Sequence, residues 1–139
     1  MIWLLAACAT TGLPQRTITV GGHTITVEVA ATDEARAYGL KNRDSLPPDT
    51  GMLFVYDDEK PRSYWMEDTH LDLSIAFVDR TGHIVRITDM IAYDTNNRGQ
   101  SLYPAKYAVE MAKGWFTTKG VVVGDAITGL PASTAEAAP

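Results

Sequence analysis

The sequence predicts a mainly β fold: a compact β-rich sandwich or partly closed barrel of the α+β class, with one or two short helices. Many short segments alternate apolar and polar residues with the period of two that turns one strand face inward, and turn residues separate these segments. Only one segment carries the end signals of a helix. The length of 139 residues indicates a single domain.

The first expected elements are a β-hairpin and a short helix. Residues 17–20 and 24–29 alternate in polarity on either side of Gly21-Gly22, and glycine accepts the positive φ angles of a tight hairpin turn without strain. Thr32 can cap a helix with two acidic residues in its first turn, and Gly39 is placed to end that helix.

The rest of the chain continues the pattern of short strands and turns. A second hairpin is expected where 73–79 and 83–89 flank a turn that ends in Gly82. The polar stretch 93–104 predicts a long loop, and such loops are commonly functional or mobile. The other expected elements are a loop at 43–49, strands at 51–56 (closed by polar residues 57–61), 63–66 and 107–111, a helical turn at 115–119, an interrupted closing strand at 121–128 and a disordered tail from Pro131.

The N-terminal residues predict attachment to a membrane through a lipid. The apolar run that ends in Leu5-Ala6-Ala7-Cys8 resembles the lipobox of a bacterial lipoprotein signal, in which the cysteine carries the lipid. The alternative is a frayed hydrophobic terminus with a chance cysteine. We expect residues 1–15 to be a signal remnant and tether, 16–130 the β-rich domain and 131–139 the tail. The domain is then periplasmic or at the cell envelope, with Cys8 as the lipidation site.

Composition argues against nucleic acid as a partner. The chain has 17 acidic and 12 basic residues, a net charge of -5 and no basic block. We expect a monomer that contacts a membrane only through a lipid anchor at Cys8 and that carries no cofactor and no metal. A small molecule or a cell-envelope component is the expected ligand.

An ordered series of residues resembles a known family. The series is Gly39-Leu40, Arg43, Leu46, Gly51-Met52-Leu53-Phe54, Trp65-Met66, Thr69, Ile75-Ala76-Phe77-Val78-Asp79, Gly82, Ala108, Glu110, Gly114-Trp115, Gly120 and Gly124-Asp125. Over residues 17–128 it resembles the domain of unknown function 192 family of bacteria and archaea, whose members are often exported. The resemblance implies a compact β-rich fold and no particular activity. The chain departs from the family pattern at Glu67, where lysine is common, at Asp72 and Ser74, where proline and aspartate are common, and at Lys41, where methionine is usual.

The first candidate site residues are Arg43 and Glu110. Strand alternation places Glu110 on the same face as Ala108 and opposite Tyr107 and Val109. Glu110 is then either on a solvent-exposed face or in a polar notch among alanines. An arginine is the natural partner of a carboxylate in such a notch, so we expect Arg43 to pair with Glu110. The pair is either a structural link between the loop and the sheet or part of a ligand site.

Aromatic and methionine side chains form the second group of candidates. Trp65, Trp115, Met52 and Met66 are each either core residues or, for the two tryptophans, the lining of a cleft for a ring-shaped or apolar ligand. Exposure of an indole ring in the structure would favour the cleft.

The third group is the polar corner that contains Asp68, Thr69 and His70. Glu67 and Asp72 add further oxygen ligands, but the spacing matches no standard metal motif, so a solvated acidic corner is the simpler interpretation. Asp68 and Glu110 could also act as a carboxylate pair in glycoside cleavage.

These observations favour a small-ligand binding or accessory module at the cell envelope. Its expected pocket is lined by Arg43, Trp65, Asp68, Thr69, Glu110 and Trp115. The alternative is a glycan-directed envelope hydrolase that uses Asp68 or Glu110 as general acid or base. A structural partner-binding protein with an exposed apolar patch is a third possibility.

Overall fold

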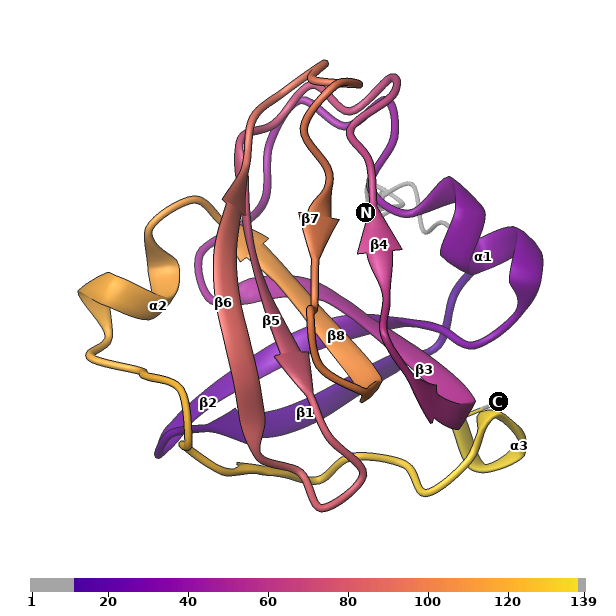
Figure 1. Cartoon of the computed structure of the whole chain (residues 1–139), viewed down its shortest axis with the longest axis vertical. Coiled ribbons are helices and arrows are strands. Elements are labelled where there is room, and N and C mark those ends of the chain that lie inside the picture. The colour runs from indigo at the N-terminus through magenta and orange to yellow at the C-terminus, as the bar shows by residue number, and fades with distance from the viewer. Residues whose placement is uncertain (1–11, 138–139) are drawn as a thin grey trace, which may run out of the picture.

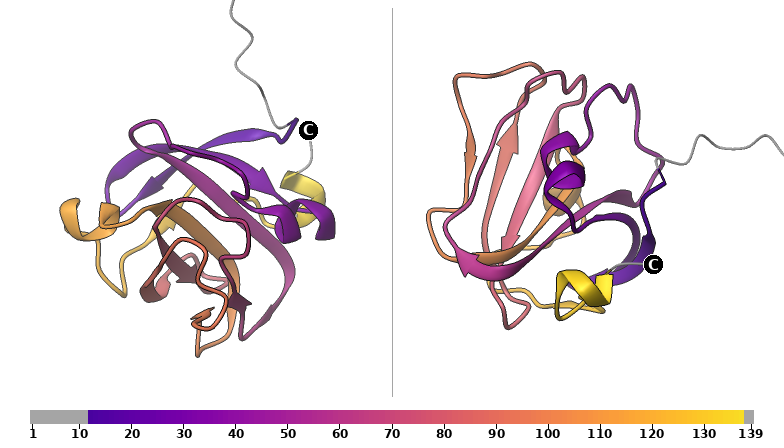
Figure 2. Two further views of the ribbon diagram at one scale, coloured as in Figure 1. Left: turned by 90° about the horizontal axis from the view of Figure 1, so that it is seen from above. Right: turned by 90° about the vertical axis from the view of Figure 1, so that its right-hand side faces the viewer.

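A seven-stranded sheet that curls into a half-barrel dominates the computed structural model, which describes residues 12–137 (Figures 1 and 2). Its strand order is β6-β5-β8-β3-β2-β1-β9, and β4 and β7 form a separate two-stranded sheet. The mainly β prediction is confirmed. The elements are β1 (Gln15–Val20), β2 (His23–Ala30), α1 (Asp33–Tyr38), β3 (Thr50–Lys60), β4 (Ser63–Tyr64), β5 (Leu73–Val78), β6 (Ile84–Met90), β7 (Gly99–Gln100), β8 (Ala105–Ala112), α2 (Trp115–Thr118), β9 (Ile127–Thr128) and α3 (Thr134–Ala137).

Both predicted hairpins and the predicted helix are present. β1 pairs with β2 and β5 with β6, each in antiparallel register. The Thr32 hydroxyl accepts a hydrogen bond from the Ala35 amide at 3.1 Å, and Gly39 ends α1 at a φ of 53°. Because α1 crosses from β2 to β3, these two strands pair in parallel, whereas the other strand pairs of the sheet are antiparallel.

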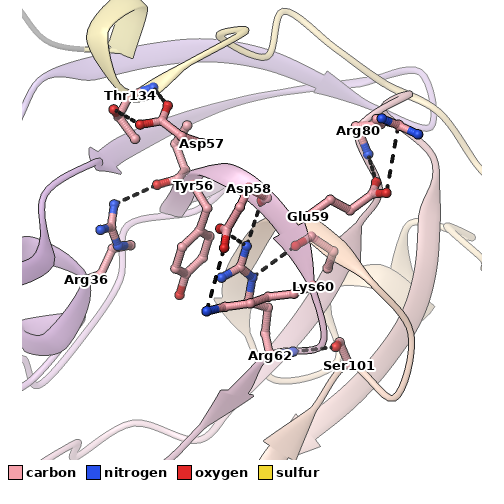
Figure 3. A network of polar contacts seen from close by, with 12 residues as sticks. Arg36, Tyr56, Asp57, Asp58, Glu59, Lys60, Arg62, Arg80, Ser101 and Thr134 are labelled. Carbon is pink, nitrogen blue, oxygen red and sulfur yellow. Dashed lines mark hydrogen bonds and ion pairs between the residues drawn. The ribbon is translucent and has the colours of Figure 1, made fainter.

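The polar stretch expected to close β3 instead continues the strand to Lys60, and this prediction was wrong. Each acid in it has a partner (Figure 3). Asp58 accepts a hydrogen bond from Arg62 at 2.6 Å, and Glu59 accepts one from the Arg80 amide at 2.7 Å. Beyond Phe54, β3 no longer pairs with β2, and its polar residues can continue the strand there because they bond to neighbouring segments.

The tail predicted to be disordered from Pro131 contains the ordered helix α3 as far as residue 137. The Thr134 amide and hydroxyl donate to the Asp57 carboxylate at 2.9 and 2.8 Å, and the Tyr107 hydroxyl donates to the Pro131 carbonyl at 2.7 Å. The remote acid on β3 thus acts as the N-terminal cap of α3. The composition of the tail gives no sign of this long-range contact, which is why the tail was predicted to be disordered.

Other boundaries differ by small amounts. The expected strand at 63–66 is reduced to β4, and the loop at 93–104 contains β7, its pairing partner. Of the expected closing strand at 121–128, only β9 is regular. The residues just before it bond to β6: the Gly124 amide donates to the Ile84 carbonyl at 2.8 Å, and the Ile84 amide donates to the Asp125 carbonyl at 3.0 Å. These bonds link the two edges of the sheet at one end of the half-barrel.

Each face of the sheet carries a buried apolar cluster. Val109 and Tyr107 belong to the apolar cluster on one face, and Ala108 belongs to the cluster on the other face, as the alternation of β8 predicted. α1, Leu40 and the segment that contains Met66 pack against the Ala108 face. Glu110 shares that covered face and is 5% exposed, so it is not on a solvent-exposed surface. This burial positions the candidate site.

No helix within residues 12–137 is long and apolar enough to cross a membrane. Cys8 and its lipobox-like sequence lie outside the described residues.

Candidate functional site

Four side chains lie in one row across the sheet, on the face covered by α1. The register pairs Glu28 of β2 with Met52 of β3, Met52 with Glu110 of β8, and Glu110 with Ile75 of β5. Neighbouring strands are about 4.8 Å apart, so the backbones at Glu28 and Glu110 are separated by roughly 10 Å. The same face therefore carries two acids with an apolar residue between them.

Arg43 pairs with Glu28, and the predicted pair with Glu110 was wrong. Both terminal nitrogens of Arg43 donate to the Glu28 carboxylate, one of them at 3.1 Å. Glu28, which Arg43 meets, lies on the same face of the sheet as Glu110 but two strands away from it. Arg43 lines a separate depression beside α1, together with Leu13 and Thr32.

Glu110 lies in a different environment. Among the described residues, no hydrogen bond or ion pair reaches its carboxyl group. Its neighbours in the row, Met52 and Ile75, are fully buried. Burial raises the pKa of Glu110 from 4.5 to about 8, because the charged form loses its hydration and gains no compensating partner. The side chain is therefore mostly neutral at pH 7.

Glu110 lines a pocket of about 230 Å³. The pocket is bounded by the C-terminal half of α1 and the turn that follows it, by β3, by β4 and by the corner at 65–69. Its lining is rich in aromatic rings and includes two basic side chains. These rings and basic groups belong to Arg36, Tyr38, Lys41, Phe54, Tyr56, Tyr64 and Trp65.

A pair of tyrosines forms one wall. The hydroxyls of Tyr56 and Tyr64 are 2.7 Å apart, and the Tyr64 ring packs edge-on against Phe54 at 5.0 Å. Burial, with contributions from Tyr56 and from Glu110, raises the pKa of Tyr64 well above 10, so the Tyr64 hydroxyl keeps its proton. The wall presents rings and hydroxyl groups to a ligand.

Arg62 supports this wall from behind (Figure 3). Its guanidinium lies 3.6 Å from the centre of the Tyr56 ring, and it donates to the Ala105 carbonyl at 2.9 Å and to Asp58 at 2.6 Å. Arg36 lies over the same ring at 4.7 Å and donates to the Val55 carbonyl. The ring is held between two guanidinium groups, which fixes its orientation.

Two of the departures from the family pattern, Lys41 and Glu67, lie at the pocket: Lys41 lines it and Glu67 pairs with Lys41. The ammonium group of Lys41 is 3.9 Å from the carboxylate of Glu67, its only ion pair within residues 12–137. The pair is partly exposed, and such pairs contribute little to stability. Its effect is to place a cation at the mouth of the pocket.

The remaining predicted site residues divide into two groups. Trp65 and Thr69 line the pocket, and Trp65 is 44% exposed with Arg98 over its ring at 5.0 Å. Asp68 is exposed, has a positive φ of 53° and is not among the residues that line the pocket. The Trp115 indole donates to Asp49 at 2.9 Å and packs with the apolar cluster on the other face of the sheet. The predicted grouping of all six residues around one pocket is therefore corrected.

The acidic corner is held by local contacts. His70 meets Asp44 at 3.1 Å and stacks on Tyr93, and Asp72 accepts a hydrogen bond from the Ala92 amide at 2.8 Å. Within the described part of the chain, no three histidine, cysteine, aspartate or glutamate residues are grouped so that they could hold a metal ion.

Sequence reasoning missed the tyrosine pair and the contribution of α1. Tyr56 and Tyr64 are eight residues apart on two strands that belong to different sheets, so alternation within a strand carries no signal of their contact. One weak signal of the contribution of α1 was Gly39, which predicted where the helix ends. Because α1 ends beside the Phe54 ring, the residues that follow it lie over the pocket.

The arrangement can do two things chemically. A neutral carboxylic acid at the base of an aromatic pocket can donate or accept a hydrogen bond, which suits recognition of a small polar ligand. A carboxyl group that titrates near neutral pH can also transfer a proton to a bound molecule.

Comparisons with known proteins extend these observations. The model of the DUF192 family, described as "Uncharacterized ACR", matches residues 16–129. No curated protein matches the chain. Among solved structures, the chain is similar to a putative transcription regulator from Sinorhizobium meliloti, with 29% identity, a TM-score of 0.81 and coverage of 86% of this chain and 97% of that one. It also resembles a protein of unknown function from Novosphingobium aromaticivorans, with 24% identity, a TM-score of 0.74 and coverage of 83% and 84%. The second similarity shows the fold alone.

Proposed function

The chain belongs to the DUF192 family, and on this premise we propose that it is a small-ligand binding module whose binding site is the pocket above Glu110. One observation carries the proposal: a buried carboxyl group faces an aromatic-lined pocket and has no partner among the described residues. Buried polar groups in native proteins are nearly always hydrogen-bonded. A ligand that supplies the missing partner would stabilise the folded state.

The size of the pocket supports recognition of a small molecule. At about 230 Å³ the pocket lies below the roughly 300–1,000 Å³ that is usual for drug-sized ligands, so it suits a compound smaller than these.

The similar protein from Sinorhizobium meliloti is described as a putative transcription regulator. The net charge of -5 on this chain gives little electrostatic attraction for phosphates, which argues against nucleic acid as its ligand.

A thermal-shift screen against amino acids, sugars, peptidoglycan fragments, nucleotides and metal salts tests the proposal. A compound present at one hundred times its dissociation constant stabilises the folded state by roughly 2.7 kcal/mol. Glu110→Gln should reduce or abolish the shift, because the carboxyl group is the polar anchor. Asp68→Asn is the matched control: it changes an exposed acid outside the pocket, and asparagine accepts the positive φ found there. Loss of the shift in both variants, or in neither, contradicts the assigned site.

Acid–base catalysis is the second candidate function, and the raised pKa of Glu110 favours it. The glycan-directed form with Asp68 as a second acid has little geometric support, since Asp68 does not line the pocket with Glu110. If Glu110 acts as a general acid on a glycan, oligosaccharides, whose leaving alcohol must be protonated, should be cleaved with a rate that falls above about pH 8. Glu110→Gln should abolish cleavage and Asp68→Asn should not. Failure of every glycoside tested, together with a positive ligand screen, leaves binding as the function.

Location at the cell envelope is also a proposal, supported by Leu5-Ala6-Ala7-Cys8. Labelling of the full chain with radioactive palmitate in a bacterial host tests it. Label should enter the wild-type chain and not Cys8→Ala; equal labelling, or none in either chain, contradicts it.

A further inference from the structure

The two acids on the covered face of the sheet differ in one respect. Glu28 is paired within the protein, since Arg43 donates to both of its carboxylate oxygens. Glu110 lies two strands away in the same row, has no such partner among the described residues and faces the pocket. A basic group on a ligand would supply for Glu110 what Arg43 supplies for Glu28.

The walls around Glu110 suit a cation. Besides Tyr56, whose ring already lies between two guanidinium groups, the pocket is lined by the rings of Phe54, Tyr64 and Trp65, and the faces of aromatic rings attract ammonium and guanidinium groups. The protein already uses rings of this pocket in this way: Arg62 lies over Tyr56 and Arg98 over Trp65.

The rim suits an anion. Arg36 and Lys41 also line the pocket, so a ligand that carried only a positive charge would be repelled at the entrance. The donors of Arg36 are largely used by Asp33 and by the Val55 carbonyl. Lys41 has only the long ion pair to Glu67 within residues 12–137, and its side chain is 23% exposed. It can therefore donate to an acidic group that enters the pocket.

We propose that the ligand is a small zwitterion of the amino-acid class, whose ammonium group pairs with Glu110 and whose acidic group faces Lys41. The inference rests on the proposed binding function and specifies its ligand. The small volume of the pocket fits a molecule of this size.

Binding of an ammonium group requires the ionised form of Glu110, so the ligand must displace the proton that Glu110 holds at neutral pH. Since burial raises the pKa of Glu110 to about 8, affinity should rise about 50-fold between pH 6 and pH 8 as the ionised fraction increases. The other titratable or charged side chains that line the pocket are Arg36 and Tyr38 of α1, Lys41, Tyr56 of β3 and Tyr64 of β4, and Glu67 faces Lys41 from the corner at 65–69.

The test uses the full chain and begins with a thermal-shift panel of the twenty standard amino acids and 4-aminobutyrate, with butylamine and butyrate as probes of matched length that carry one charge each. Titration calorimetry at pH 6, 7 and 8 then measures affinity and proton release for any compound that binds. At least one zwitterion should bind more tightly than either single-charge probe, with release of a proton and with an affinity that rises about 50-fold from pH 6 to pH 8.

Two variants separate the two ends of the site. Lys41→Met should weaken binding of the zwitterion at least tenfold and leave butylamine binding unchanged or stronger, whereas Lys113→Met changes an exposed lysine outside the pocket and should have no effect. Glu110→Gln should abolish the pH dependence. If Glu110→Gln fails to fold by circular dichroism, the pH dependence of the wild-type chain still decides the question.

The outcomes distinguish this inference from the proposed function. If neutral or anionic compounds bind at the Glu110 pocket and zwitterions do not, or if affinity falls as the pH rises, the inference is overturned and the binding function stands. If no compound in either screen binds, both are overturned.

Discussion

Replacement of Glu110 by glutamine should change the pH dependence of stability in a defined direction. In the unfolded chain the carboxyl group titrates near 4.5, and in the folded protein at about 8. Between these values the folded state holds a proton that the unfolded chain has lost. The contribution of Glu110 to the free energy of unfolding is therefore greatest below pH 4.5 and is lost as the pH rises through 8. At about 1.4 kcal/mol for each pKa unit, the full effect is about 5 kcal/mol. Glutamine cannot ionise and should not show this loss.

Urea unfolding of the wild type and Glu110→Gln at pH 5, 7 and 9 measures the effect. The two proteins should differ by about 1 kcal/mol or less at pH 5, where both side chains are neutral in the folded protein and the unfolded chain is only just above its own pKa. At pH 9 the variant should be the more stable by several kcal/mol. The comparison between variants cancels the titration of other groups, and Asp68→Asn controls for replacing an exposed acid by its amide. Parallel wild-type and Glu110→Gln curves from pH 5 to pH 9 would refute the reasoning.

Three further predictions concern packing and pairing. A double-mutant cycle on Arg43→Met and Glu28→Gln should give a coupling of about 1–3 kcal/mol in unfolding free energy, and near-zero coupling would contradict the pair. Gly51→Ala should destabilise the fold by several kcal/mol, because the added methyl carbon would lie 2.1 Å from a backbone oxygen of β8. Gly99→Ala should cost less, because the nearest atom to its added methyl belongs to a flexible side chain. If thermal denaturation gives the reverse order of stability, the register of β3 with β8 is contradicted. Thr32→Ala should cost about 1 kcal/mol by removing the cap of α1, and Thr32→Ser should restore most of it in the same assay.

Most of the fold could be predicted because its signals are local. The alternation in 17–29 and the Gly21-Gly22 turn predicted the first hairpin, and Thr32 and Gly39 predicted both ends of α1. The errors arose where a distant residue decides the local structure. The helix α3 begins at Thr134 because Asp57 caps its N-terminus. β3 continues past Tyr56 because its acids bond to other segments.

The candidate site shows the same division. Alternation in β8 placed Glu110 with Ala108 and away from Val109, as the structure has it. Which cation meets which acid depends on strand order, and the parallel contact of β2 with β3 puts Glu28, rather than Glu110, within reach of Arg43. Period-two patterns describe the two sides of a strand and contain no information on its neighbours, so the partner of Arg43 could not be predicted.

The junction of β1 with β9 has a consequence for the kinetics of folding. The Arg16 side chain donates to the Gly129 carbonyl across 113 residues of chain, and the pairing of Thr19 with Thr128 spans nearly as far. Such contacts give a high contact order, and they can form only after a large loop has been closed. During synthesis on the ribosome, β1 cannot pair with β9 until almost the whole domain has emerged. Refolding in milliseconds to seconds is therefore expected, with the β1 edge as the last part to gain protection from hydrogen exchange.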